Sequence, residues 1–151
     1  MGDEPLRTAV REEMTAALKA GDRVRLGALR MLVAAITNRE KEILHELSDD
    51  EVREVAGREV KKRSESIEAF ESAGRTELAD KERAERLVLE PYAPEQLDET
   101  AVDSLIDEAM ASTGVTSVKE MGKVMGVVMG KAKGQVDGAL VQRKVRERLG
   151  G

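Results

Sequence analysis

The most regularly spaced residues that could bear on function are glycines near the C-terminus. Gly122, Gly126, Gly130, Gly134 and Gly138 recur every four residues, which places neighbouring members on one face of a helix. Glycine inside a helix costs about 1 kcal/mol relative to alanine, so such a row indicates that another group comes close to the backbone. Tight packing of the final helix is the plainer explanation. An RNA or ligand backbone lying on the row is compatible with it.

Cationic side chains accompany this glycine row. Residues 115–151 hold 8 Lys+Arg against 3 Asp+Glu, a net charge of +5, whereas residues 1–114 hold 17 against 27, a net of -10. A solvated helix face explains many such runs. The concentration of positive charge after an acidic segment equally favours contact with an anion or a nucleic acid. The residues expected to make that contact are Lys119, Lys123, Lys131, Lys133, Arg143 and Lys144.

No set of residues predicts catalysis or a metal site. The sequence has no cysteine, which excludes thiol nucleophiles and thiolate ligands. Its one histidine, His45, has no partner predictable from the sequence and is expected at the surface. The acids of residues 48–51 suit the first turn of a helix, and Gly126 to Lys131 has neither the spacing nor the hydroxyl of a phosphate-binding loop. We predict no catalytic residue, metal or cofactor.

Apolar residues at helical spacing predict the elements that position these groups. Stripes after Leu6, from Leu26 onward to Leu47, and from Val52 to Phe70 indicate three helices, and a weaker stripe predicts a fourth from about residue 76 to 89. Gly21 and Gly74 are expected to end the first and third helices, Asp22 to cap the second, and Ser48 with Glu51 to form a capping box. Arg63 lies on the inward line of the third helix, and we expect its stem to snorkel at the bundle surface. A paired functional cation is the alternative.

Pro91 and Pro94 forbid a continuous helix and mark a boundary. Beyond it, Asp98 is expected to cap a helix ending near Gly114, Ser117 with Glu120 to form a capping box for the next helix, and Asp137 to cap the last. The sequence therefore predicts an all-α fold. An N-terminal helical bundle of about four helices, residues 1–91, is followed by a small three-helix tail module, residues 96–151.

Composition also limits the surroundings and partners. Phe70 and Tyr92 are the only aromatic residues, so stacking on bases is not expected and RNA would be contacted through phosphates and shape. No stretch approaches the ~20 apolar residues of a membrane span, and the charged start does not resemble a signal peptide. We expect a cytoplasmic protein with no membrane contact.

Two stretches resemble the GatB/YqeY family. The tail segment from Met121 to Gly138, followed by apolar residues at 141, 145 and 149, is similar to the family's tail domain. The segments 29–36, 62–70 and 73–75 resemble the N-terminal bundle of stand-alone YqeY-like proteins. The sequence departs from the motif at Gly130, where many relatives have proline, and at Gln135, where they commonly have arginine. The resemblance marks as tail-motif residues Gly122, Lys123, Lys131, Lys133, Gly134, Asp137 and Gly138.

The resemblance implies a tail shared with the B subunit of the glutamine-dependent tRNA amidotransferase, where the tail helps hold tRNA. The amidotransferase's catalytic machinery is absent from this sequence, so a link to carbon-nitrogen ligation with glutamine as amide donor is by family association. Our hypothesis is a non-catalytic module that binds tRNA or associates with an amidotransferase. The alternatives are a protein-protein adaptor that docks a partner on its acidic bundle, and an enzyme that uses the amide of glutamine.

Overall fold

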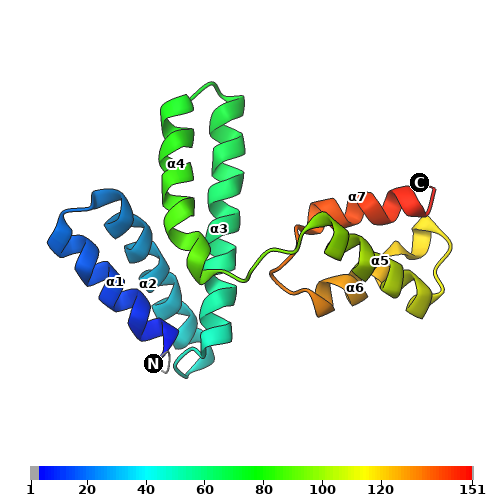
Figure 1. The fold of residues 1–151 in the computed structure, drawn as a ribbon, viewed down its shortest axis with the longest axis horizontal. Helices are drawn as coiled ribbons and strands as arrows, with labels where there is room; N and C mark the ends of the chain where they lie inside the picture. The colour runs from blue at the N-terminus through cyan, green and yellow to red at the C-terminus, as the bar shows by residue number, and fades with distance from the viewer. Residues whose placement is uncertain (1–3, 151) are drawn as a thin grey trace. The chain divides into compact units, whose positions relative to one another are not determined.

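The computed structural model describes residues 4–150, and all regular secondary structure in this range is helical. Contacts divide the chain after Pro94 into an N-terminal unit and a tail unit, which begins at Glu95. The described residues form seven α-helices and two short 3-10 turns, with no strand, which confirms the predicted all-α class (Figure 1). None of these helices is long and apolar enough to cross a lipid bilayer.

The N-terminal unit contains two helical hairpins (Figure 1). The first joins α1 (Leu6–Ala20) to α2 (Arg23–Ile43), and the second joins α3 (Asp49–Ser72) to α4 (Thr76–Leu89), which continues into the 3-10 turn η1 (Glu90–Tyr92). Helix α4 also packs against α2, so the hairpins share one core. The largest side chains that this core buries completely are Leu29, Leu32, Ile36, Leu89, Val10 and Val52.

Local signals set most helix ends in this unit. Gly21 adopts the left-handed conformation at φ 72° and ends α1, while Asp22 Oδ1 accepts the Arg25 N–H at 3.1 Å and begins α2. Ser48 and Glu51 form the predicted capping box of α3. The apolar line expected to continue to Leu47 is interrupted, because α2 ends at Ile43 and the chain turns away from the helix there.

The expectation for Arg63 is wrong. Its side chain is buried, with 6% of its surface exposed, instead of snorkelling to the bundle surface. Glu59, one helical turn earlier on α3, lies 3.3 Å from Arg63 Nη1, and Glu82 of α4 lies 3.6 Å from Nε. Because carboxylates from two helices neutralise the guanidinium, it can occupy an inward position that normally requires an apolar residue.

The tail unit contains α5 (Glu99–Thr113), the 3-10 turn η2 (Val118–Glu120), α6 (Met121–Lys131) and α7 (Gly138–Arg148). Asp98 caps α5 through the Ala101 N–H at 2.8 Å, and Asp137 caps α7 through the Ala139 N–H at 3.0 Å, both as predicted. The three helices surround a core of their own, made by Val102, Ile106, Ala109, Val115, Val124, Val128, Val141 and Val145.

The predicted capping box of α6 is absent. Ser117 Oγ accepts the N–H of Lys119, two residues ahead, at 3.3 Å, and this bond caps the 3-10 turn η2. Glu120 therefore ends that turn, and its carboxylate pairs with Lys123 at 2.9 Å. Helix α6 begins at Met121 without a side-chain cap. The short-range serine bond competes successfully with the longer capping geometry.

Candidate functional site

The glycine row is on the outer face of α6. Gly122, Gly126 and Gly130 project away from the face that buries Val124 and Val128. A Cβ atom built on any of these three glycines would meet nothing within 4 Å. The expectation that the final helix packs tightly on this row is therefore wrong. The glycines leave a stretch of α6 backbone uncovered within the described part of the chain.

The last two glycines of the series have different environments. Gly134 lies in the turn after α6 at φ 75°, a conformation that glycine adopts without strain. A Cβ on Gly138, the first residue of α7, would be 3.7 Å from Met129 Cε, which is ordinary van der Waals contact. The five regularly spaced glycines therefore have three different environments: an open helix face, a turn and the start of a helix.

Gln135 has a structural role in this chain. Its carbonyl accepts the Leu97 N–H at 2.8 Å, and its side-chain amide donates to the Glu95 carbonyl at 3.2 Å. The neighbouring Gly134 carbonyl accepts the Gln96 amide at 2.7 Å. The turn between α6 and α7 is therefore fastened to the segment that leads into α5.

Three of the predicted cations lie on α6 or next to it, and their side chains are exposed. Lys123 is next to Gly126 on the helix surface because the two are three residues apart. Its ammonium lies 2.9 Å from Glu120, and Lys131 Nζ lies 3.8 Å from Glu108 of α5. Lys119 of η2 is exposed and is three residues before Gly122. Lys119 and Lys123 are therefore near the start of the open row, whereas Lys131 pairs with α5.

Lys144 belongs to a different arrangement. Its ammonium lies 3.0 Å from Asp103 and 3.5 Å from Glu99, and only 17% of its side chain is exposed. The hydrogen bond to Asp103 raises the pKa of Lys144. Arg148 pairs with Asp103 and Asp107 of the same acidic helix. These two cations hold α7 against α5 and are not available to a polyanion in this conformation.

Arg143 and Arg146 are on the opposite side of α7. Both side chains are exposed, and neither forms an ion pair within residues 4–150. Arg146 was not among the six cations singled out from the sequence, although its spacing of three from Arg143 is the signal for a shared helix face. Among the described tail residues, the unpaired positive charge is therefore at Lys119, Arg143 and Arg146, whereas the exposed Lys133 is not free.

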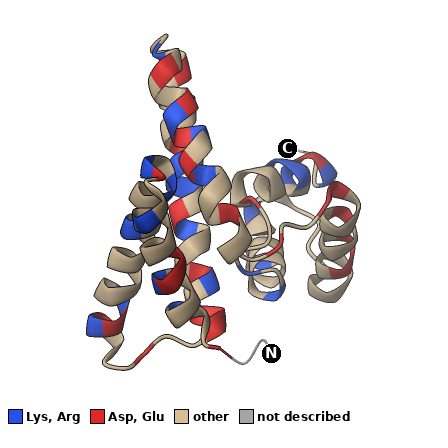
Figure 2. Ribbon diagram, turned by 60° about the vertical axis from the view of Figure 1, so that its left-hand side comes forward, with Lys and Arg blue, Asp and Glu red and all other residues tan. Residues whose placement is uncertain are grey.

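The charge of the folded tail unit differs from that of its last 37 residues. Residues 95–151 hold 8 Lys+Arg against 9 Asp+Glu, a net of -1. Helix α5 supplies four of these nine acids, and the charged positions of both units are coloured in Figure 2. Any electrostatic attraction of a polyanion must therefore come from the local distribution of charge, because the unit as a whole is nearly neutral.

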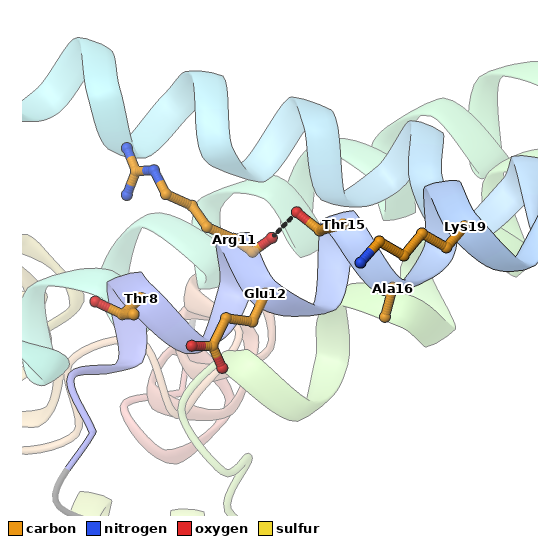
Figure 3. Close-up of a pocket in the computed structure, with 6 residues that line it drawn as sticks. All are labelled: Thr8, Arg11, Glu12, Thr15, Ala16 and Lys19. Carbon is orange, nitrogen blue, oxygen red and sulfur yellow. Dashed lines mark hydrogen bonds between the residues drawn. The ribbon is translucent and has the colours of Figure 1, made fainter.

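A hollow of about 360 Å³ on the surface of α1 does not add a candidate site (Figure 3). Its side chains all come from one helix, and the Arg11 guanidinium already donates to Thr37 at 3.2 Å. No side chain from a second helix or loop lines the hollow, so it does not surround a ligand as a binding site would. The lining residues are Thr8, Arg11, Glu12, Thr15, Ala16 and Lys19.

Comparison with known proteins gives the family. The model for Yqey-like proteins matches residues 7–149, which include both units and the entire glycine row. The chain belongs to the YqeY-like family. This finding confirms the resemblance noted from the sequence.

One curated relative of this YqeY-like chain is Altered inheritance of mitochondria protein 41, mitochondrial, of Pyrenophora tritici-repentis (strain Pt-1C-BFP). It is 29% identical over 139 residues, which cover 89% of this chain and 75% of the relative. The name places that relative in mitochondria and states no ligand or reaction. It leaves the biochemical role of the YqeY-like chain to be proposed from the site.

Proposed function

We propose that this YqeY-like protein is a non-catalytic module whose tail unit contacts tRNA and assists glutamine-dependent amidation carried out by a partner enzyme. The observation that carries the proposal is the open face of α6, where Gly122, Gly126 and Gly130 leave the helix backbone uncovered. Three glycines inside a helix cost about 3 kcal/mol in total relative to alanine. Because packing within the tail unit does not use them, close approach of an outside molecule is the use that remains.

The cations around the row support a polyanion as that molecule. Lys119 and Lys123 are adjacent to the first glycines, and a phosphate could compete for Lys123 because its pairing with Glu120 is exposed to solvent. The similarity of the tail to that of the amidotransferase B subunit, where the tail helps hold tRNA, supports tRNA as the polyanion. A side chain added to the row would keep the phosphate backbone away from α6.

The test is tRNA binding by wild type, Gly126→Leu and the matched control Gly27→Leu, measured by fluorescence anisotropy across a salt series. Gly27 is also a helical glycine with nothing within 4 Å of its Cβ position, but it belongs to α2 of the N-terminal unit. We expect Gly126→Leu to weaken binding about tenfold, as loss of one or two charge-assisted contacts would. Gly27→Leu should bind like wild type. The wild-type log affinity should fall with log salt by ~0.7 to 0.9 per contacted phosphate.

A second function, a protein-protein adaptor, is favoured by the ion pairs of α7. Lys144 and Arg148 are engaged by acids of α5, and the tail unit is close to neutral. A glycine row equally allows another helix to approach closely. If the same two leucine variants differ in a pull-down of protein partners after RNase treatment, and none of the three proteins binds tRNA in a salt-dependent manner, the adaptor function replaces the tRNA proposal.

A further inference from the structure

The N-terminal unit contains a cleft that the proposed function does not use. Helices α3 and α4 run side by side (Figure 1). Side chains of these two helices and one side chain from α2 line the cleft. Its volume is about 440 Å³, within the range of small-molecule sites. Apart from the serine and the methionine, all lining side chains are charged. The lining residues are Met31, Lys62, Arg63, Glu65, Ser66, Glu82 and Glu85.

The two cations of the cleft already have carboxylate partners. Glu59, which is buried and does not line the cleft, lies 3.1 Å from Lys62 Nζ and 3.3 Å from Arg63 Nη1. Glu82 lies 3.6 Å from Arg63 Nε. Two negative charges thus offset the two positive ones before the remaining carboxylates are considered.

Two carboxylates remain, and one of them is buried. Glu85 is 9% exposed, and within residues 4–150 it accepts no hydrogen bond and forms no ion pair. Glu65 also has no partner in this range, but it is exposed. Burying most of a carboxylate without a partner is costly, because it loses hydration and gains nothing in return. The oxygens of Glu85 are not among the fully buried unpartnered atoms, so they retain access to solvent from the cleft that they line.

The arrangement favours a cation over an anion. Lys62 and Arg63 together with the four glutamates at 59, 65, 82 and 85 have a net charge of -2. Arg63 Nε, which donates no hydrogen bond, is fully buried and cannot be reached by a ligand in the cleft. An anion that entered the cleft would be repelled by the unpaired carboxylates of Glu65 and Glu85. It could not accept a hydrogen bond from Arg63 Nε.

The size and lining of the cleft favour an organic cation over a metal ion. The described residues contain no group of three or more side chains that could hold a metal ion, so these carboxylates are too dispersed for one. Met31, which is 50% exposed, contributes an apolar surface at the same cleft. A cationic group on an aliphatic stem can pair with a carboxylate while its stem contacts the methionine.

We propose that the α3–α4 cleft binds an organic cation, an alkylammonium or guanidinium group on an aliphatic stem, and that Glu85 is its charge partner. Glu65 and Glu82 contribute to the negative potential at the cleft. The cation pairs with Glu85, the one buried charged side chain of the N-terminal unit that has no partner among the described residues. This binding site does not depend on the tRNA proposal, which concerns the tail unit.

Titration calorimetry of the full chain with spermidine and with agmatine tests the proposal. We expect saturable binding that weakens as salt increases, and a loss of about tenfold in affinity for Glu85→Gln, as removal of a charge-assisted hydrogen bond would produce. Glu68→Gln is the matched control, because Glu68 is an exposed carboxylate of α3 that does not line the cleft. It should bind like wild type.

The source of the cation is distinguished by a second arm with a blocked tripeptide, acetyl-Gly-Arg-Gly-amide. Binding of the peptide without the free amines assigns the cleft to an arginine side chain of a partner, and the reverse result assigns it to a small-molecule amine; both results support the proposal. Glu65→Gln, on the exposed rim, provides a variant with little risk to folding and should weaken binding about twofold to threefold. Equal affinity for wild type and both cleft variants, or no saturable binding of any probe, would overturn it.

Discussion

The ion pair between Arg7 and Glu40 joins α1 to the end of α2. Arg7 Nε donates to Glu40 Oε2 at 2.7 Å, and the same oxygen accepts the Leu47 N–H at 2.9 Å. Both ionic side chains are largely buried, with 21% and 15% of their surfaces exposed. The hydrogen bond from Arg7 lowers the pKa of Glu40 and raises that of Arg7. The Glu40 carboxylate therefore anchors both α1 and the loop that follows α2.

Glu40→Gln should destabilise the protein at pH 7 by about 1 to 2 kcal/mol, because the amide cannot accept both bonds as well. The folded-state pKa of Glu40 is depressed, so its contribution is fully present above the ordinary glutamate pKa of about 4.3. It is lost as pH falls through the lower folded value. Urea unfolding at pH 7 and near pH 3 should show the deficit only at the higher pH. Glu42→Gln, in an exposed pair with Arg39, should change stability little at either pH.

A deficit of the same size at both pH values would contradict this account. It would mean that the substitution acts through packing or the unfolded chain and not through the charge of Glu40.

Tertiary partners of single residues were the least predictable feature at this scale. The inward position of Arg63 followed from helical spacing, but its partners Glu59 and Glu82 did not, because Glu82 comes from another helix. Leu44 is a similar case. It adopts φ 61° and is 88% exposed, although leucine is a residue type that is usually buried. Such outcomes depend on which helices pack together, and local spacing does not contain that information.

Helix ends were well predicted where the signal was complete within a few residues. Asp22, Ser48, Asp98 and Asp137 cap the helices expected of them, since a short polar side chain finds the free N–H groups of its own helix. Ser117 failed because its hydroxyl bonds a nearer N–H. Competition between local bonds of similar length thus limits what a capping motif alone can predict.

The open glycine row of α6 leads to a prediction about stability at the scale of the element. Gly126→Ala should stabilise the tail unit by about 1 kcal/mol, because the new methyl group meets no neighbour and alanine loses less backbone entropy. Gly114→Ala in the same unit should destabilise it by about 1 to 2 kcal/mol, since Gly114 ends α5 at φ 66°. Chemical denaturation of the tail unit, followed by amide exchange in α5 to α7, measures both. Destabilisation by Gly126→Ala would show that the row is covered in solution.

At the scale of the whole molecule, the net charge of the tail depends on which residues fold together. The last 37 residues have a net charge of +5, but the folded unit that contains them has a net of -1, because residues 95–114 add six acids and no cation. Some of these acids are on α5 and pair with α7. Both net charges can be counted from the sequence alone. Choosing between them requires knowing that a segment belongs to the same core as the helix before it, which here follows from the apolar residues that α5, α6 and α7 share. The predicted cation set was therefore only partly brought together around the glycine row.

The two separate cores predict that damage to one unit leaves the other intact. Leu29 is fully buried in the N-terminal core, and Val128 is fully buried in the tail core. Leu29→Ala should cost the N-terminal unit about 2 to 5 kcal/mol, and Val128→Ala should lower the stability of the tail unit alone. Hydrogen exchange measured by mass spectrometry should show faster exchange in α2 to α4 for the first variant and in α5 to α7 for the second. If Leu29→Ala accelerates exchange in both units equally, the two cores unfold as one cooperative system, and variants of the α3–α4 cleft and of the glycine row could no longer be interpreted independently.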